Sequence, residues 1–468
     1  LCRRLLRPGE GARGGGHVVV AAASALGPCL VLADADGRPL RPAILYGVDT
    51  RAAAEIDELE AALGPVEILA RCGSPLTSQA VGPKLRWVAR HEPDVLRQAR
   101  LLFSAGSWLV HRLTGQYVLD HHTASQWVPL YDVHRNGWID EWAAAVVEGL
   151  GEDDATAGRG SGAGAHVPEL PPLPPLLWAQ EPVGLVSREA AAATGLPAGI
   201  PVAAGSIDAF VGLVGAGLRG PGRLLLVYGT TMFLAEAMTR ARPDPRLWSP
   251  TSLLPGSRNL AAGTVAGGAL AAWVRDLTGE PDLARLTAGA RQVPAGAGGL
   301  VVLPYFSGER SPLFDPKARG VVEGLTLAHT SGHLFRAALE GTACAVRHNL
   351  DVMRGAGCVP VRLVASDAAL KGTLWPQIVS DVTGLEQDIL TGPAVTTVGS
   401  GLLAAMAAGL ADLDTDWSGL SHTVVPDPGV AAVYDDLYER YRGLYPATLE
   451  IEHQLAADSQ PAPAAGQS

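Results

Sequence analysis

The segment between residues 304 and 354 constrains the fold most strongly, because a turn-rich loop, a short strand and a long helix follow one another there. Gly320 and Gly324 bracket the strand, which is typical of places where the backbone approaches a neighbour closely or turns tightly. Thr330 or Ser331 can cap the helix. Apolar residues then recur at near-helical spacing and predict one buried helix face: Leu334, Ala338, Val346, Leu350 and Met353.

Strand and helix patterns alternate along the chain, and this alternation predicts an α/β fold with sheets covered by helices. Apolar runs predict strands at residues 18–24, 30–33, 40–46, 199–204 and 223–228. Helical patterns lie at residues 51–63, 84–100, 107–114, 208–215, 263–276, 331–354, 374–383 and 399–408. A Gly/Ala/Ser-rich stretch at residues 158–164 and a proline run at 168–175 predict an exposed connection.

The chain has 468 residues, which is long enough for two domains with separate cores. Its formal net charge of −11 argues against nucleic acid or an anionic membrane surface as the main partner. An anionic substrate would therefore need a local cluster of hydrogen-bond donors. No apolar stretch is long enough to span a membrane.

The 5 cysteines are odd in number and form no Cys-x-x-Cys pair. They predict reduced thiols in the cytoplasm and argue against a zinc site. His121 and His122 are interpreted as a pair in a loop, and nothing near them has metal-ligand spacing. The sequence therefore predicts no metal site built from protein side chains.

Asp208 is the candidate for acid–base chemistry. It ends a Gly-Ser-Ile-Asp motif that follows an apolar strand and opens a helix, which would direct the carboxylate from the strand end into a cleft. A carboxylate placed in this way could act as a general base. From the residues alone, a helix cap explains Asp208 at least as well.

Two signatures resemble those of the FGGY carbohydrate kinases, especially the xylulokinase-like members. Residues 83–88 resemble the amino-terminal signature. Nine residues fill the carboxy-terminal signature: Gly320, Val322, Gly324, Leu325, His333, Leu334, Ala337, Leu339 and Glu340. The resemblance covers nearly the whole chain and implies two ribonuclease-H-like α/β domains, of the actin and hexokinase superfold, around a cleft.

The resemblance also implies the domain bounds. We expect a sugar-binding amino-terminal domain over residues 1–217, a nucleotide-binding carboxy-terminal domain over 218–447 and a tail over 448–468. Family members begin with a phosphate-binding hairpin that carries Asp-x-Gly-Thr, and this chain has no such element. We therefore expect a first domain that is incomplete at its start.

On the nucleotide side, the resemblance implies a phosphate loop, glycine turns and an adenine loop. Its candidate residues are Gly229, Thr230, Thr231, Gly263, Gly267, Ser366, Asp367 and Gly401. Structural turns and close helix packing explain several of these glycines nearly as well. In the adenine loop the family usually has consecutive glycines, so Ser366 and Asp367 bear on the nucleotide preference.

On the sugar side, the resemblance implies that Asp208 is the general base and contacts the substrate. Asp49 and Arg51 resemble the family's aromatic-x-Asp-x-Arg element with one extra residue, and an ordinary ion pair is the equally weighted alternative. Glu309 and Arg310 are interpreted as a surface turn, with a place in the cleft as the alternative.

Residues 24–28 differ from the xylulokinase pattern. Xylulokinases carry Gly-Gln-Met-His there, and its polar groups contact the sugar. Leu26, Gly27 and Pro28 cannot make those side-chain hydrogen bonds, which argues for a substrate other than D-xylulose.

The resemblance implies a carbohydrate kinase that phosphorylates a ketose or polyol with ATP and Mg²⁺. The expected partners are ATP and a small sugar or polyol, without nucleic acid or membrane. A homodimer is an open alternative to a monomer. The first alternative is a catalytically silent relative that acts as a binding protein. The second is an actin- or chaperone-like ATPase of the same superfold. The sequence does not identify the sugar, the phosphorylated hydroxyl or the oligomeric state.

Overall fold

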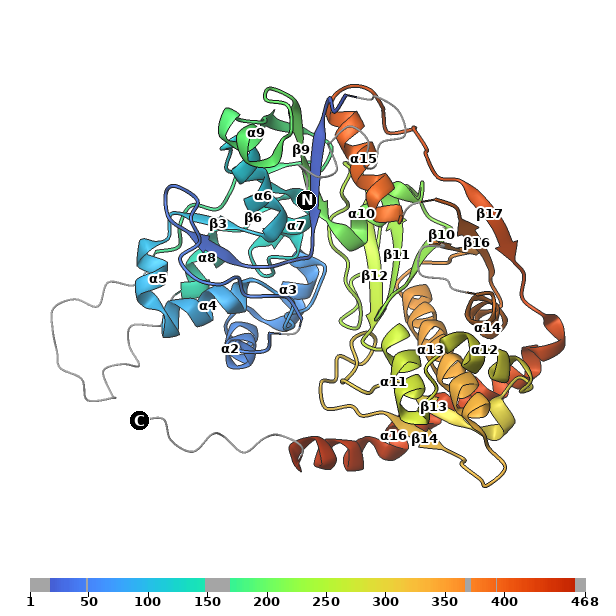
Figure 1. Ribbon diagram of the computed structural model, residues 1–468. Helices are drawn as coiled ribbons and strands as arrows, with labels where there is room; N and C mark the ends of the chain where they lie inside the picture. The colour runs from blue at the N-terminus through green and yellow to red at the C-terminus, as the bar shows by residue number, and fades with distance from the viewer. Residues whose placement is uncertain (1–16, 48, 148–168, 367–371, 393, 459–468) are drawn as a thin grey trace, which may run out of the picture. The chain divides into compact units, whose positions relative to one another are not determined.

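The computed structural model describes residues 17–47, 49–147, 169–366, 372–392 and 394–458 (Figure 1). The chain forms two compact units, each built from segments that are distant in sequence. Unit 1 comprises Leu1–Arg219, Ala237–Asn259 and Val395–Trp417, and unit 2 comprises Gly220–Glu236, Leu260–Ala394 and Ser418–Ser468. Within the described ranges, no helix is both long enough and apolar enough to cross a lipid bilayer.

Unit 1 contains a three-stranded sheet whose middle strand is β9 (Pro201–Ile207). Strand β1 (Ala21–Ala25) pairs with it in parallel, and β8 (Pro182–Leu185) pairs antiparallel. Helix α6 (Ala105–Thr114) packs on β1 and β9. Nearly every residue of β9 is buried, as its run of small apolar residues predicts for a strand covered on both faces.

Unit 1 contains further helices and strands. They are β2 (Val31–Ala33), α2 (Ala53–Leu63), α3 (Pro65–Cys72), α4 (Gly82–His91), α5 (Pro93–Gln98), β3 (Leu101–Phe103), β4 (Leu119–Asp120), α7 (His121–Ser125), β5 (Tyr131–Asp132), β6 (Gly137–Trp138), α8 (Asp140–Val147), β7 (Leu176–Leu177) and α9 (Arg188–Thr194). Helices α2, α3, α4 and α8 contribute to one apolar core, in which Trp127 and Tyr131 are fully buried.

Helices α10 (Asp208–Gly215) and α15 (Val395–Ala407) of unit 1 pack against each other through glycines. A Cβ on Gly399 would lie 2.1 Å from the carbonyl oxygen of Val211. This distance is far below van der Waals contact, so the helix backbones can approach this closely only at a residue without a side chain.

Unit 2 contains a six-stranded sheet with the order β12-β11-β10-β15-β16-β17. Its strands are β10 (Arg223–Tyr228), β11 (Met232–Met238), β12 (Arg258–Thr264), β15 (Arg362–Ser366), β16 (Glu386–Leu390) and β17 (Leu420–Val424). The last two residues of β11 and the first two of β12 belong to the 237–259 segment of unit 1. Strands β10, β15 and β16 are parallel neighbours, whereas β11 and β17 pair antiparallel to β10 and β16. The carboxyl ends of the three parallel strands therefore lie at one edge of the sheet, where α/β sheets bind their ligands.

The helices of unit 2 are α11 (Gly268–Thr278), α12 (Leu283–Arg291), α13 (Ser331–Gly355), α14 (Leu374–Thr383) and α16 (Ala431–Asp458). A separate hairpin pairs β13 (Val301–Leu303) with β14 (Val321–Glu323), which Gly320 and Gly324 flank as predicted. Thr330 is the N-cap of α13 and forms a capping box with His333. The predicted α/β fold is confirmed, and the residue ranges predicted for α10, β10 and α14 agree with the structure.

Two predicted elements are wrong. The helix predicted over residues 84–100 is two helices, α4 and α5, because Pro93 cannot donate a backbone hydrogen bond and disfavours a helical conformation at Glu92. The strand predicted over residues 40–46 makes a single bridge, between Ile44 and Leu30, because Pro42 has no N–H group for a longer ladder.

Three further predictions need correction or fall outside the structure. Gly263 lies in β12, so the helix predicted over residues 263–276 begins later, at Gly268. The tail predicted over residues 448–468 is helical as far as Asp458, since the buried Glu452 accepts the N–H of Arg319 and ties α16 to the rest of unit 2. The connection predicted at residues 158–164 lies outside the described residues.

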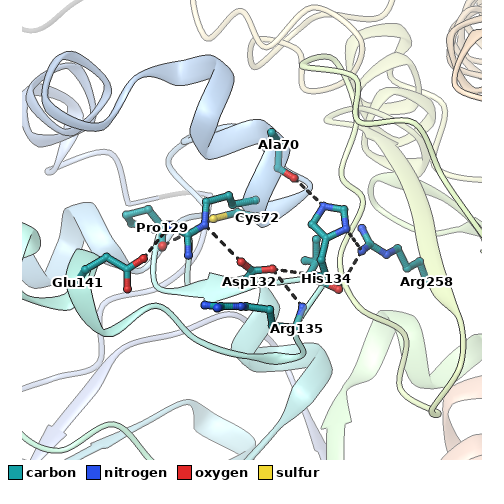
Figure 2. A network of polar contacts seen from close by, with 10 residues as sticks. Ala70, Cys72, Pro129, Asp132, His134, Arg135, Glu141 and Arg258 are labelled. Atoms are coloured by element: carbon teal, nitrogen blue, oxygen red, sulfur yellow. Dashed lines mark hydrogen bonds and ion pairs between the residues drawn. The ribbon is translucent and has the colours of Figure 1, made fainter.

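A polar network joins two segments of unit 1 (Figure 2). Arg258 donates to the carbonyl oxygen of Val133 at 2.9 Å and to Nδ1 of His134 at 3.1 Å. His134 Nε2 donates to the carbonyl oxygen of Ala70 at 2.9 Å, and Asp132 accepts the backbone N–H of His134. These bonds help to hold residues 237–259 against the amino-terminal segment of the same unit.

The contact between α10 and α15 predicts the effect of two alanine substitutions. Gly399→Ala should lower the free energy of unfolding by about 1–3 kcal/mol, because its Cβ would force the two helix backbones apart. Gly401→Ala is the matched control on the same helix, since its Cβ would meet only the Trp417 ring at 3.6 Å. Alanine at residue 401 should be neutral or stabilise by up to about 1 kcal/mol. Urea unfolding measures both, and equal stabilities of the two variants would contradict this packing.

Candidate active site

Asp208 lies where β9 ends and α10 begins, as its motif predicts. It is half-buried and is the first residue of the helix, with Ile207 as the N-cap. One carboxylate oxygen, Oδ1, accepts the N–H of Ala209 at 2.7 Å. The other oxygen has no hydrogen-bond partner within the described residues, so it is available to a ligand.

Gly205 gives the motif its shape. Its φ is +66°, and a Cβ there would lie 1.8 Å from the carbonyl oxygen of Ala23 on β1. The register between β1 and β9 shifts at this point. The crossing of the two strands therefore requires glycine three residues before Asp208.

Asp120 holds the strand just before Asp208. Its Oδ1 accepts the hydroxyl of Ser206 at 2.6 Å and the N–H of Thr123 at 2.9 Å. Burial raises the pKa of Asp120 to about 6, although these hydrogen bonds oppose the shift. The sequence pattern gave no role to Asp120, whose position on β4 brings it to β9 only through the fold.

His122 holds the helix just after Asp208. Its ring is fully buried and lies 4.2 Å from that of Phe210 on α10. Nδ1 donates to the carbonyl oxygen of Thr251 at 2.7 Å, and burial lowers the pKa of His122 to about 4. The prediction of a loop pair at His121 and His122 is wrong, because both belong to helix α7.

Asp49 and Arg51 form the ion pair that the sequence left as an alternative. Arg51 Nε lies 2.9 Å from Oδ1 of Asp49, and the guanidinium stacks over the Trp87 ring at 4.7 Å. The hydrogen bond from Arg51 lowers the pKa of Asp49. Both groups remain partly exposed, so the pair can still meet a polar ligand.

Lys84 is a further residue of this region, and the sequence reasoning gave it no function. Its side chain is almost fully buried, and Nζ donates to the carbonyl oxygens of Leu45 and Ser78 at 2.8 and 2.6 Å. Burial lowers the pKa of Lys84 to about 8. Asp49 lies within electrostatic range of Lys84, and both Lys84 and Asp208 lie within range of the Cys29 thiol. These interactions place the predicted sugar-side residues in one region of unit 1.

In unit 2, Gly229, Thr230 and Thr231 form the loop of the hairpin between β10 and β11. Thr230 is exposed and Thr231 is half-buried. Neither hydroxyl makes a hydrogen bond within the described residues. Because β10 is one of the parallel strands, this loop lies at the edge where their carboxyl ends meet.

Gly267 and Gly268 support this loop by close packing. Their N–H groups donate to the carbonyl oxygens of Thr230 and Gly229 at 2.9 and 2.8 Å. A Cβ on Gly268 would lie 2.9 Å from the Gly229 oxygen, so a side chain would disturb the loop. Gly263 lies near the end of strand β12, four residues before Gly267, and its N–H donates to the Ser311 hydroxyl at 2.8 Å.

The remaining nucleotide-side candidates do not all lie near the 229–231 loop. Ser366 ends β15 and therefore lies at the same sheet edge as the hairpin loop. Asp367 lies outside the described residues. Gly401 is exposed on α15 and belongs to unit 1, unlike the other candidates of this group.

The surface turn predicted at Glu309 is wrong, because Glu309 is buried. Its Oε1 accepts the N–H groups of Val265 and Arg310 at 2.8 and 2.7 Å, which requires the side chain to fold inward. Oε2 is buried without a hydrogen-bond partner. Burial raises the pKa of Glu309 to about 8.

Among the residues that the structure describes, no three His, Cys, Asp or Glu side chains gather as they would around a metal ion. The four cysteines in this part of the chain are buried and unpaired. A carboxylate at a strand end in one unit and a glycine-threonine hairpin at strand ends in the other are features of enzymes that transfer phosphoryl groups.

Comparison with known proteins supports this class. Residues 16–215 match the N-terminal domain, and residues 224–408 the C-terminal domain, of the FGGY family of carbohydrate kinases. The xylulose kinase of Escherichia coli K12 is 31% identical over 427 residues, which cover 90% of this chain and 83% of that protein. The glycerol kinase of Nocardia farcinica is 32% identical over 403 residues, which cover 82% of this chain and 73% of that protein.

A solved structure agrees as well. The crystal structure of xylulose kinase from Rhodospirillum rubrum superposes with a TM-score of 0.78 at 34% identity, covering 92% of this chain and 84% of that one. The chain belongs to the FGGY family of carbohydrate kinases. It therefore has the two-domain, actin- and hexokinase-like fold of a phosphotransferase that uses ATP and acts on an alcohol group.

The buried carboxyl of Asp120 generates a prediction about pH. Its pKa is higher in the folded state than in the unfolded chain, so the folded state binds more protons between about pH 4 and pH 6 and loses stability as the pH rises through that window. In Asp120→Asn this loss should be absent. The unfolding free energy of the variant minus that of the wild type should therefore increase by roughly 1–3 kcal/mol from pH 4 to pH 7.

Urea unfolding at the two pH values measures this difference. Asp57→Asn is the matched control, because Asp57 lies exposed on α2 and should show no such change. A constant difference for Asp120→Asn would mean that Asp120 is not shifted by burial.

Proposed function

We propose that this protein transfers the γ-phosphoryl group of ATP to a hydroxyl of a ketose or polyol, with Asp208 as the general base. The observation that carries the proposal is the position of Asp208 at the end of β9, with one carboxylate oxygen left without a partner in the described residues. Membership of a family of carbohydrate kinases supports the substrate class.

Asp208 would accept the proton of the substrate hydroxyl as the hydroxyl oxygen forms its bond to phosphorus. The N–H of Ala209 would hold Oδ1 in place while the second oxygen receives the proton. Asp120 and His122 would keep this geometry, because they fix Ser206 and Phe210, two residues before and two residues after Asp208.

We propose that Gly229, Thr230 and Thr231 bind the phosphate groups of ATP. The two threonine hydroxyls make no hydrogen bond within the described ranges, and together with the glycine backbone of a strand-end loop they are suitable donors for phosphate oxygens. Mg²⁺ would arrive with ATP, since no cluster of metal ligands lies in the described part of the chain, and it would supply positive charge against the charge that develops during transfer. Ser366, at the same edge, would lie on the nucleotide side as well.

We propose that the sugar binds in unit 1 and that D-xylulose is not the preferred substrate. Asp49 and Arg51 remain partly exposed and could bind sugar hydroxyls. Leu26 is 43% exposed and lines a small cavity with Asp120 and Ser206, so it presents an apolar surface where xylulokinases have hydrogen-bonding side chains. We also propose a cytoplasmic enzyme, because the described cysteines are all unpaired thiols.

The test of the proposed function is a coupled assay of ADP release over pentuloses, hexuloses and tetritols. With the best substrate, Asp208→Asn should lower kcat by about 10²–10⁴-fold and change KM little, because the variant keeps its shape but cannot accept the proton. Full activity of this variant would exclude Asp208 as the base. ATP turnover without any sugar would favour an ATPase scaffold, and no turnover at all would favour a silent relative.

The 229–231 loop generates a separate prediction. Thr231→Val removes a hydroxyl but keeps the shape of the side chain, and it should raise KM for ATP by about 10-fold or more through the loss of a charge-assisted hydrogen bond. Thr231→Ser keeps the hydroxyl and should stay within about 3-fold of the wild type. If both variants behave alike, the hydroxyl of Thr231 does not bind phosphate.

A further inference from the structure

Arg310 differs from the other arginines of unit 2. It is half-buried, and its guanidinium has no hydrogen bond or ion pair within the described residues. In the same part of the chain, the other arginines of unit 2 all bond a carboxylate, a hydroxyl or a carbonyl oxygen: Arg223, Arg275, Arg285, Arg291, Arg319, Arg336, Arg347, Arg354, Arg362, Arg440 and Arg442.

Most of the Arg310 side chain is covered, yet its guanidinium nitrogens are not among the buried atoms and keep access to solvent. A cation held in this way, without a partner among the described residues, can bind an anion that arrives from outside the chain.

The nearby carboxyl groups make no hydrogen bond or ion pair with the guanidinium of Arg310. Glu309 uses Oε1 to accept two backbone N–H groups, and burial raises its pKa to about 8 although the charge of Arg310 opposes the shift. Asp315, which bridges to Glu309 through the backbone, accepts hydrogen bonds from Tyr445 and His453. The positive charge of Arg310 is thus left for a ligand.

The residues on either side fix the backbone of Arg310 against the end of β12. Glu309 accepts the N–H of Val265, and the Ser311 hydroxyl accepts the N–H of Gly263. Arg310 therefore lies beside the turn that leads from β12 into α11.

That turn is joined directly to the 229–231 loop. The Thr264 hydroxyl accepts the N–H of Met232, the residue that follows the loop, at 3.4 Å. Gly267 and Gly268 donate to Thr230 and Gly229. The backbone of Arg310 is consequently joined, through this turn, to the loop that carries Thr230 and Thr231.

We propose that Arg310 is a phosphate-binding residue of this site, whose guanidinium donates hydrogen bonds to the polyphosphate of the nucleotide. This inference rests on the proposed role of the 229–231 loop in binding ATP. Arginine suits phosphate particularly well, because its planar fork donates two parallel hydrogen bonds and stays charged at every relevant pH.

The test is calorimetric titration of the full chain with a non-hydrolysable ATP analogue, with ADP and with adenosine, each in the presence of Mg²⁺. Arg310→Gln should weaken binding of the ATP analogue by about 10- to 100-fold and leave adenosine binding unchanged, because adenosine has no phosphate. Arg310→Lys keeps the charge but not the planar fork, and its affinity for the ATP analogue should lie between those of the wild type and of Arg310→Gln. Comparing ADP with the analogue shows which phosphate group Arg310 contacts.

Arg285→Gln is the matched control, because Arg285 is an exposed arginine of the same unit and pairs with Glu280. It should bind all three ligands as the wild type does, and thermal unfolding should show that each variant is folded. If Arg310→Gln binds the ATP analogue as tightly as the wild type while Thr231→Val does not, the role of Arg310 is wrong and the proposed function stands. If the wild type itself does not bind the analogue, the proposed function is wrong and this inference fails with it.

Discussion

The crossing of β9 with β1 is the constraint on which the candidate catalytic carboxylate depends. A glycine with positive φ lets the two strands approach at Ala23, and the chain then turns into α10 with Asp208 as its first residue. Asp120 and His122 fasten the residues just before and just after it. The position of one carboxylate thus follows from close backbone contact and two buried polar side chains, which cost free energy unless each hydrogen bond is made.

In unit 2, less regular structure holds the candidate phosphate-binding loop in place. The 229–231 loop is short and exposed in part, yet two glycines, the Thr264 hydroxyl and the buried Glu309 hold the turn beside it. Such bracing keeps donor groups in place before a ligand binds, so less conformational freedom is lost on binding. In both units, close backbone contacts and buried polar side chains hold the candidate functional groups in place, although the groups themselves differ.

The sequence predicted much of the fold where local signals agreed. Helix α13 has its cap at Thr330 and glycines at both ends of the preceding strand, and Asp208 has a strand before it and a helix after it. Prediction failed where a single proline decided the outcome, as at Pro93. The sequence also carries no sign of which polar side chains are buried, because nothing in the local sequence shows that Glu309 folds inward or that Lys84 is enclosed. Those properties arise from residues that are distant in the chain, and only the packed structure reveals them.

Helix α15 has a consequence for how the protein is made. It supplies part of unit 1, yet it follows most of unit 2 in the chain. When synthesis has reached residue 394, every other segment of unit 1 has therefore been made, but α15, which packs on α10, has not. The apolar side of α10 is exposed until α15 has been synthesised, and a chaperone or another nascent chain can bind it during that interval. Unit 1 is consequently completed only after most of unit 2 has been made.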